Sequence, residues 1–132
     1  MISAAHPAAS WFLYALCLVV GLVIAVPLLF FPLRWARAVG WRIPDDTDLV
    51  VYLARCLGGV VAAVVVIVLR IAPKPEANLL FFEVIGLICA VVAAIHALGW
   101  IEGRQPWIEN VETVFYAAIA AACWGFQRSM IP

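Results

Sequence analysis

Apolar residues dominate four long stretches of the chain, and polar residues gather in the short segments between them. The apolar stretches run from Trp11 to Phe31, Leu49 to Leu69, Leu79 to Ile101 and Trp107 to Phe126. Each is close to the ~20 residues that an α-helix needs to span the hydrocarbon core of a bilayer. None shows the alternating pattern of a membrane β-strand. The sequence therefore predicts an all-α membrane protein with four transmembrane helices.

The connections predict how these helices are arranged. The turn around Pro73 and the turn from Gly103 to Pro106 are short, so the helices that each joins should be antiparallel neighbours. Asp45 and Asp48 offer capping groups before the second helix, and Pro75 and Pro106 suit the first turns of the third and fourth. We expect one antiparallel four-helix transmembrane domain covering residues 1–132.

The connection between the first and second helices combines tryptophan with arginine. From Leu33 to Arg42 it carries two tryptophans and three arginines, a composition typical of helices at the lipid headgroups. We expect a short interfacial helix here. Because it is the most basic connection, the positive-inside rule places it on the cytoplasmic side of the membrane, with both termini outside. We expect this membrane to be a bacterial plasma (inner) membrane.

Pro27 interrupts the first helix near its end. Proline has no backbone N–H, so the carbonyl of Val23 loses its usual helical donor. We expect a kink at this position, as an adaptation for packing.

Composition supports the membrane interpretation and excludes one class of partner. The 132 residues are 67% hydrophobic and 12% charged, well beyond the roughly half apolar content of soluble domains. Eight basic residues balance eight acidic ones, which argues against a nucleic-acid partner. The start of the chain lacks the basic region of a signal peptide, so we expect the first helix to remain in the mature protein.

The four cysteines fall one in each apolar stretch, at Cys17, Cys56, Cys89 and Cys123. None forms a CxxC pair, so they resemble small packing residues more than metal ligands or a redox pair. His96 has only His6 as a possible second haem ligand, and His6 belongs to the opposite side of the membrane. The sequence predicts no metal and no firmly bound cofactor.

Five ionisable residues lie within the predicted spans and require partners or a purpose, because each costs at least ~2.5 kcal/mol in the membrane. They are Arg55, Glu83, His96, Glu109 and Glu112. At 1.5 Å of rise per residue, Arg55, His96 and Glu112 lie about 8–9 Å inside their helix ends. Antiparallel threading gives these three residues one depth on one side of the membrane.

Helical periodicity favours a pair among them. The face of the second helix that carries Arg55 also carries small residues, so a neighbouring helix can approach it closely. The other residues of this face are Tyr52, Gly59, Ala62 and Val66. The fourth helix has one polar stripe, which should turn away from lipid: Glu109, Glu112, Thr113, Tyr116, Ala120, Cys123 and Gln127. We therefore predict an ion pair between Arg55 and Glu112, in a buried ion-pair or ligand-binding cluster with His96, Glu109 and Tyr52.

Two residues fit this cluster less directly. In the third helix a small face runs through Glu83, Gly86, Ala90, Ala93 and Ala97, and His96 lies roughly 100° from its centre. His96 is either an interfacial histidine or a member of the cluster. Glu83 lies near the opposite surface, where it either pairs with Arg70 and Lys74 or serves as a second candidate site that relays protons.

The stretch from Tyr52 to Phe126 resembles the DoxX-like group of small four-helix membrane proteins. The likeness rests on the segment from Leu53 to Gly58, which reads LARCLG, on His96 near the end of the third helix and on Glu112 early in the fourth. Some members of that group are linked to quinone-dependent or oxidative-stress systems. The resemblance implies architecture more than activity. Small multidrug exporters also have four spans, but they place a carboxylate in the first helix, where this chain has none.

Three functions remain open. The first is a non-enzymatic accessory or packing subunit of a membrane complex, or a homo-oligomer, with lipid and other membrane subunits or itself as partners. The second is a redox-linked protein that binds a quinone or lipid headgroup near Arg55, His96 and Glu112, beside Tyr52 and Trp100. The third is a proton-coupled transporter, which needs a water path that the apolar helix interiors do not offer. We predict the first, with no catalytic residues.

Overall fold

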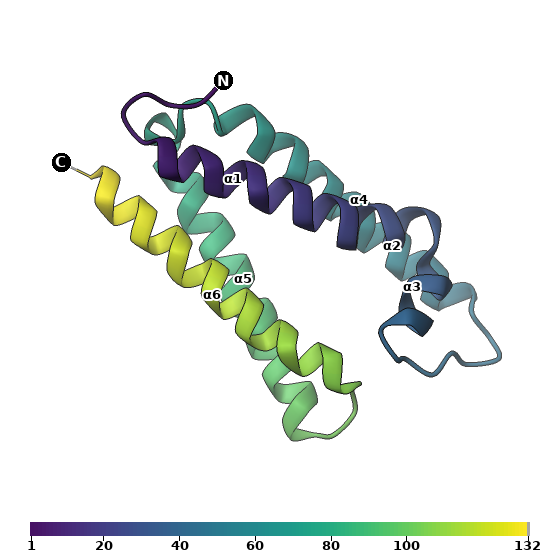
Figure 1. Ribbon diagram of the computed structural model, residues 1–132. Coiled ribbons are helices and arrows are strands. Elements are labelled where there is room, and N and C mark those ends of the chain that lie inside the picture. Colours follow the sequence, from purple (N-terminus) through teal and green to yellow (C-terminus); the bar gives the residue numbers. More distant parts are fainter. Residues whose placement is uncertain (132) are drawn as a thin grey trace. The chain divides into compact units, whose positions relative to one another are not determined.

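The computed structural model describes residues 1–131, and helices account for most of them (Figure 1). Six α-helices follow one another along the chain: α1 (Pro7–Val20), α2 (Val26–Phe30), α3 (Pro32–Ala38), α4 (Asp48–Ile71), α5 (Leu79–Ile101) and α6 (Trp107–Met130). A π-helical turn, Gly21–Ala25, joins α1 to α2, and a 3-10 turn, Pro75–Ala77, precedes α5. The described part of the chain contains no strand, which confirms the all-α prediction.

Three helical segments are long and apolar enough to cross a membrane. They are Pro7–Phe30, Asp48–Ile71 and Leu79–Ile101, and they match the first three predicted spans. Helix α6 is 24 residues long, like α4. Glu109, Glu112 and Arg128 make it less apolar. The membrane-capable helices are thus confirmed for three of the four predicted spans.

Large apolar side chains project outward from these helices. Leu22 and Val60 are each 62% exposed, and Leu87 is 59% exposed. Soluble proteins rarely present apolar surfaces of this extent to water. The outward faces therefore suit contact with lipid.

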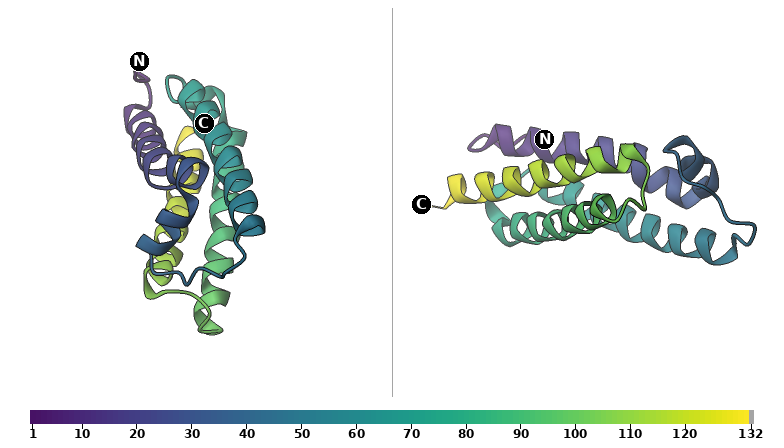
Figure 2. Two further views of the ribbon diagram at one scale, coloured as in Figure 1. Left: turned by 90° about the vertical axis from the view of Figure 1, so that its right-hand side faces the viewer. Right: turned by 90° about the horizontal axis from the view of Figure 1, so that it is seen from below.

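The chain divides into two compact units, Met1–Pro75 and Glu76–Pro132. In the first unit, α1 and α2 pack along α4 (Figures 1 and 2). The buried Ser10 hydroxyl donates to the carbonyl of Ala72 over 2.6 Å, and the Cys17 thiol donates to the carbonyl of Val65 over 3.6 Å. These two contacts fix α1 along the C-terminal half of α4.

Glycine in α4 permits a closer approach near the other end of this pair. A Cβ atom at Gly58 would lie 2.9 Å from the backbone nitrogen of Leu29, whereas nothing lies within 4 Å of one at Gly59. The contact between α4 and α2 is therefore made at Gly58 and not on the predicted small face that carries Gly59. The two positions differ by 100° around the helix, and the close contact with α2 falls on the Gly58 side.

The backbone departs from α-helical hydrogen bonding directly before Pro27. The π-helical turn ends at Ala25, and the indole N–H of Trp35 donates to the carbonyl of Val23 over 2.8 Å. Val23 is the residue whose carbonyl Pro27 cannot serve. A side chain from α3 therefore supplies a donor that the proline lacks, which satisfies a group that would be costly in an apolar environment.

Helix α3 occupies the connection in which a short helix was predicted, and it ends before the predicted boundary at Arg42. Gly40 adopts a φ of +95°, a conformation that residues with a side chain rarely adopt. The N–H of Trp41 then bonds to the carbonyl of Ala36 over 2.9 Å. This arrangement terminates the helix in the manner of a Schellman cap.

The proline and aspartate signals lie close to the observed helix starts. Pro75 begins the 3-10 turn rather than α5, and Pro106 is the residue immediately before α6. The Asp48 N–H, at the start of α4, donates to Asp46 Oδ1 over 3.2 Å. The predicted boundaries are therefore right to within a few residues.

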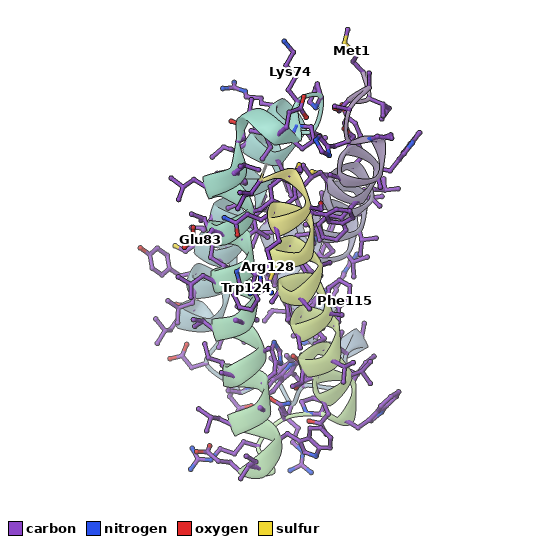
Figure 3. The ribbon with its side chains drawn as sticks, turned by 90° about the vertical axis from the view of Figure 1, so that its left-hand side faces the viewer. Met1, Lys74, Glu83, Phe115, Trp124 and Arg128 are labelled. Atoms are coloured by element: carbon purple, nitrogen blue, oxygen red, sulfur yellow. The ribbon has the colours of Figure 1, made fainter. Side chains whose placement is uncertain are left out.

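In the second unit, α5 and α6 form a hairpin. Trp124 of α6 lies between the two helices (Figure 3), where its Nε1 atom would be 2.8 Å from a Cβ at Gly86 of α5. Phe82 and Phe126 pack with ring centroids 6.5 Å apart. Gly86 and the buried Ala93 confirm the predicted small face of α5.

The cysteines pack as the sequence predicted at three positions. Cys17, Cys89 and Cys123 are buried and free, whereas Cys56 is free and exposed. Burial of an uncharged thiol is favourable because free cysteine behaves as a small apolar residue.

Candidate functional site

The turn of the α5–α6 hairpin brings three ionisable side chains together. His96 lies near the C-terminal end of α5, and Glu109 and Glu112 lie in the first two turns of α6. Gly103, with a φ of +65°, reverses the chain between the helices. Glu109 and Glu112 are three residues apart, so they share one face of α6.

The imidazole of His96 lies between the two carboxylates. Its Nδ1 atom is 3.4 Å from Glu109 Oε2, and its Nε2 atom is 3.8 Å from Glu112 Oε2. One ligand-type atom from each of the three residues falls within 4.8 Å of the others. We call His96, Glu109 and Glu112 the hairpin cluster.

Tyr116 closes one side of the hairpin cluster. Its ring stacks on the imidazole with centroids 5.5 Å apart and an interplanar angle of 17°. The Tyr116 hydroxyl also interacts with the carboxylate of Glu112, one turn earlier on the same helix. These contacts hold the orientations of the imidazole and the carboxylate together.

Gln105 braces the turn beside the cluster. Its Nε2 atom donates to the backbone carbonyl of His96 over 3.0 Å and to Asn110 Oδ1 over 2.8 Å. A side chain at Gly99 would collide with Gln105. The end of α5 and the start of α6 are therefore connected by backbone and side-chain contacts as well as by the cluster.

The cluster is largely shielded from solvent. Glu109 is 5% exposed, and the side chains of His96 and Glu112 are 17% and 24% exposed. Burying carboxylates is costly unless partners compensate their charge. Glu112 is the most exposed member of the cluster.

The polar stripe predicted for the fourth helix does turn inward. Glu109, Ala120 and Cys123 are buried, and Glu112 and Gln127 are half-buried. Gln127 reaches α5 at the opposite end of the hairpin, where its Nε2 atom is 3.4 Å from the carbonyl of Leu79 and 3.5 Å from Glu83 Oε2. Polar contacts thus connect the two helices near both ends.

The remaining candidate residues lie elsewhere. Arg55 and Tyr52 belong to α4 of the first unit, and both are exposed. The pairing of Arg55 with Glu112 stays a prediction, as does pairing of Glu83 with Arg70 or Lys74. What the structure brings together is His96 with Glu109 and Glu112.

The sequence left His96 open between an interfacial histidine and a member of the cluster, because helical phase places its side chain at the edge of the small face. The imidazole is long enough to reach α6 from the edge of the small face, and Glu109 and Glu112 meet it on both sides. The available signal was the short turn, which brings the last turns of α5 beside the first turns of α6.

No protein-family model, curated protein or solved structure matches this chain in the comparisons made.

Proposed function

We propose that this chain is an integral membrane protein that crosses the bilayer four times and acts as a non-enzymatic packing component. It serves either as an accessory subunit of a larger membrane complex or as a homo-oligomer. The short segments between the long helices support this proposal, because they leave little chain outside the membrane.

The proposed fourth crossing is α6. Its polar residues face α5, whereas Val111 and Val114 are 56% and 67% exposed. A helix whose polar stripe is covered by a neighbour presents an apolar surface to lipid. The charged residues therefore do not prevent α6 from spanning the membrane as part of a hairpin.

Helix α3 is the proposed interfacial helix. Arg34 and Arg37 are exposed, and Trp35 is half-buried against the first helix. Exposed arginines next to a tryptophan suit the level of the headgroups. We place this helix on the cytoplasmic surface of a bacterial plasma membrane.

One observation carries the packing function: the ionisable groups of α5 and α6 contact one another. Both nitrogens of His96 face carboxylates, and its ring face is covered by Tyr116. Polar groups that satisfy one another across two helices fix the register of those helices. This use of the side chains requires neither a substrate nor a catalytic step.

A quinone or lipid headgroup bound near Arg55, His96 and Glu112 is the second candidate. The partial exposure of His96 and Glu112 favours it, since a ligand needs access to the polar atoms. The likeness to the DoxX-like group adds the expectation of a redox link. Proton-coupled transport ranks third.

Purification in mild detergent, followed by size exclusion and native mass spectrometry, tests the proposal. We expect a stable assembly with copies of itself or with other subunits. The double variant His96→Ala, Glu112→Gln should weaken this assembly. A wild-type protein that carries a small organic molecule, together with a double variant that keeps its assembly but loses that molecule, would instead establish the ligand site.

A further inference from the structure

The hairpin cluster combines the ligand types of a metal site. Within residues 1–131 it is the group in which three side chains able to bind a metal converge. One ligand atom from each lies within 4.8 Å of the other two. The three come from two different helices of one compact unit. We propose that His96, Glu109 and Glu112 bind one divalent cation that joins α5 to α6. This inference goes beyond the packing function, which assigns the three side chains no ligand.

An imidazole nitrogen with two carboxylate oxygens suits a first-row divalent ion. Zn²⁺, Mn²⁺ and Fe²⁺ all accept this combination of ligands, whereas Mg²⁺ and Ca²⁺ favour sites made of oxygen alone. The absence of a cysteine from the cluster removes the preference for soft metals that thiolates confer. The chemical class is therefore a borderline divalent cation.

To hold such an ion, the three ligand atoms, which lie within 4.8 Å of one another, must close around one nitrogen of His96. Ligand atoms at ~2.0–2.2 Å from a metal lie about 3.0–3.5 Å from one another. The Nδ1 atom of His96 is already 3.4 Å from Glu109 Oε2. Glu112 faces the other nitrogen, Nε2, so its carboxylate must turn toward the Nδ1 side, and its side chain is the most exposed of the three. Once one imidazole nitrogen binds the ion, the other can donate to a carboxylate oxygen, as is common around metal-bound histidines.

Charge and burial favour occupancy by a cation. Two carboxylates approach the same imidazole, and Glu109 is 5% exposed. A divalent ion balances two carboxylate charges where a membrane makes charge separation costly. The ion therefore stabilises the arrangement in which both carboxylates point into the hairpin.

Neighbouring side chains hold the three proposed ligands in position. Tyr116 stacks on the imidazole and interacts with Glu112, and Gln105 donates a hydrogen bond to the backbone carbonyl of His96. Thr113 follows Glu109 by one helical turn, and its buried Oγ1 atom makes no hydrogen bond within the described residues. Because Thr113 lies in the same two turns of α6 as the carboxylates, the proposed site includes its hydroxyl as a further oxygen ligand.

Titration of the chelator-treated, detergent-purified protein with Zn²⁺ in a calorimeter tests the proposal, and Co²⁺ absorbance reports the coordination. We expect one ion per chain and a rise in Tm with the metal. Glu109→Gln and Glu112→Gln should each weaken binding by at least ~10-fold, because they keep the side-chain shape but remove the charge. Glu83→Gln, at the other end of α5, is the matched control and should bind as the wild type does.

Three results would overturn the site: no binding by the wild type, binding as tight as that of the wild type in both cluster variants, or a loss in Glu83→Gln equal to that in the cluster variants. If Glu109→Gln fails to fold, Glu112→Gln still decides the question through its binding and through the metal-dependent rise in Tm. Helix content and size exclusion, measured without metal, separate a loss of ligands from a loss of fold. Loss of the ion with an intact assembly would leave the packing function standing.

Discussion

Gly58 and Gly59 are adjacent in the sequence but meet different surroundings. A methyl group at Gly58 would press on the backbone of Leu29, which cannot move as a side-chain end can, whereas the space around Gly59 is open. Gly58→Ala should therefore destabilise the protein by about 1–3 kcal/mol through overpacking. Gly59→Ala should be neutral or slightly stabilising, because alanine favours helix. Thermal unfolding in detergent compares the two, and equal effects would contradict the assigned contact between α2 and α4.

Glu112 has an observed neighbour, His96, and a predicted one, Arg55. Double-mutant cycles distinguish them, because only side chains that interact show a coupling energy. We expect about 0.5–2 kcal/mol of coupling between His96→Ala and Glu112→Gln, in line with their contact. The same cycle with Arg55→Ala tests the predicted ion pair. Zero coupling in the His96 cycle would contradict a stabilising role for this contact.

Residue-level prediction succeeded where helical phase alone decided the outcome. The inward polar stripe of α6 and the small face of α5 follow from the 3.6-residue period. The contacts of His96 depend in addition on the length of its side chain and on how far α6 is offset along α5. A single sequence specifies neither quantity, so it left the role of His96 open, and the structure adds its contacts with Glu109 and Glu112.

At the scale of the helical element, Pro27 shows how one missing donor shapes a segment. The sequence predicts a disturbance at Pro27, and the structure adds the π-helical turn and the bond from Trp35 to Val23. The tryptophan was interpreted only as an interfacial anchor. Its second contact depends on the position of α3 after the turn at Phe31, which the local pattern does not determine.

Trp35→Phe removes the indole donor but keeps an aromatic ring. We expect a loss of about 1 kcal/mol, the usual contribution of one hydrogen bond. In a Pro27→Ala background the loss should be smaller, because residue 27 then has its own N–H to offer. Trp11→Phe is the matched control, since Trp11 is 63% exposed. Melting temperatures of the four variants check the comparison, and additive losses would argue against a shared carbonyl.

At the scale of the whole molecule, hydropathy identified the helices because lipid leaves few other ways to satisfy the backbone. The predicted spans from residues 11–31, 49–69 and 79–101 each match a membrane-capable helix. Segment-averaged hydropathy is ambiguous for α6, because it sums a polar face and an apolar face. The hairpin contacts show that the polar face of α6 lies against α5, which supports the proposed fourth crossing.

The number of crossings decides whether the two ends of the chain lie on the same side of the membrane. Single cysteines at Ala4, Ala38 and Ser129, in a protein whose native cysteines are replaced, allow labelling of each site in intact cells. Four crossings predict that an impermeant reagent labels Ala4→Cys and Ser129→Cys, whereas Ala38→Cys requires a permeant one. Labelling of Ala38→Cys alone would reverse the orientation but keep four crossings. Labelling of only one end would mean that α6 does not cross the membrane, which would contradict the proposed fourth crossing.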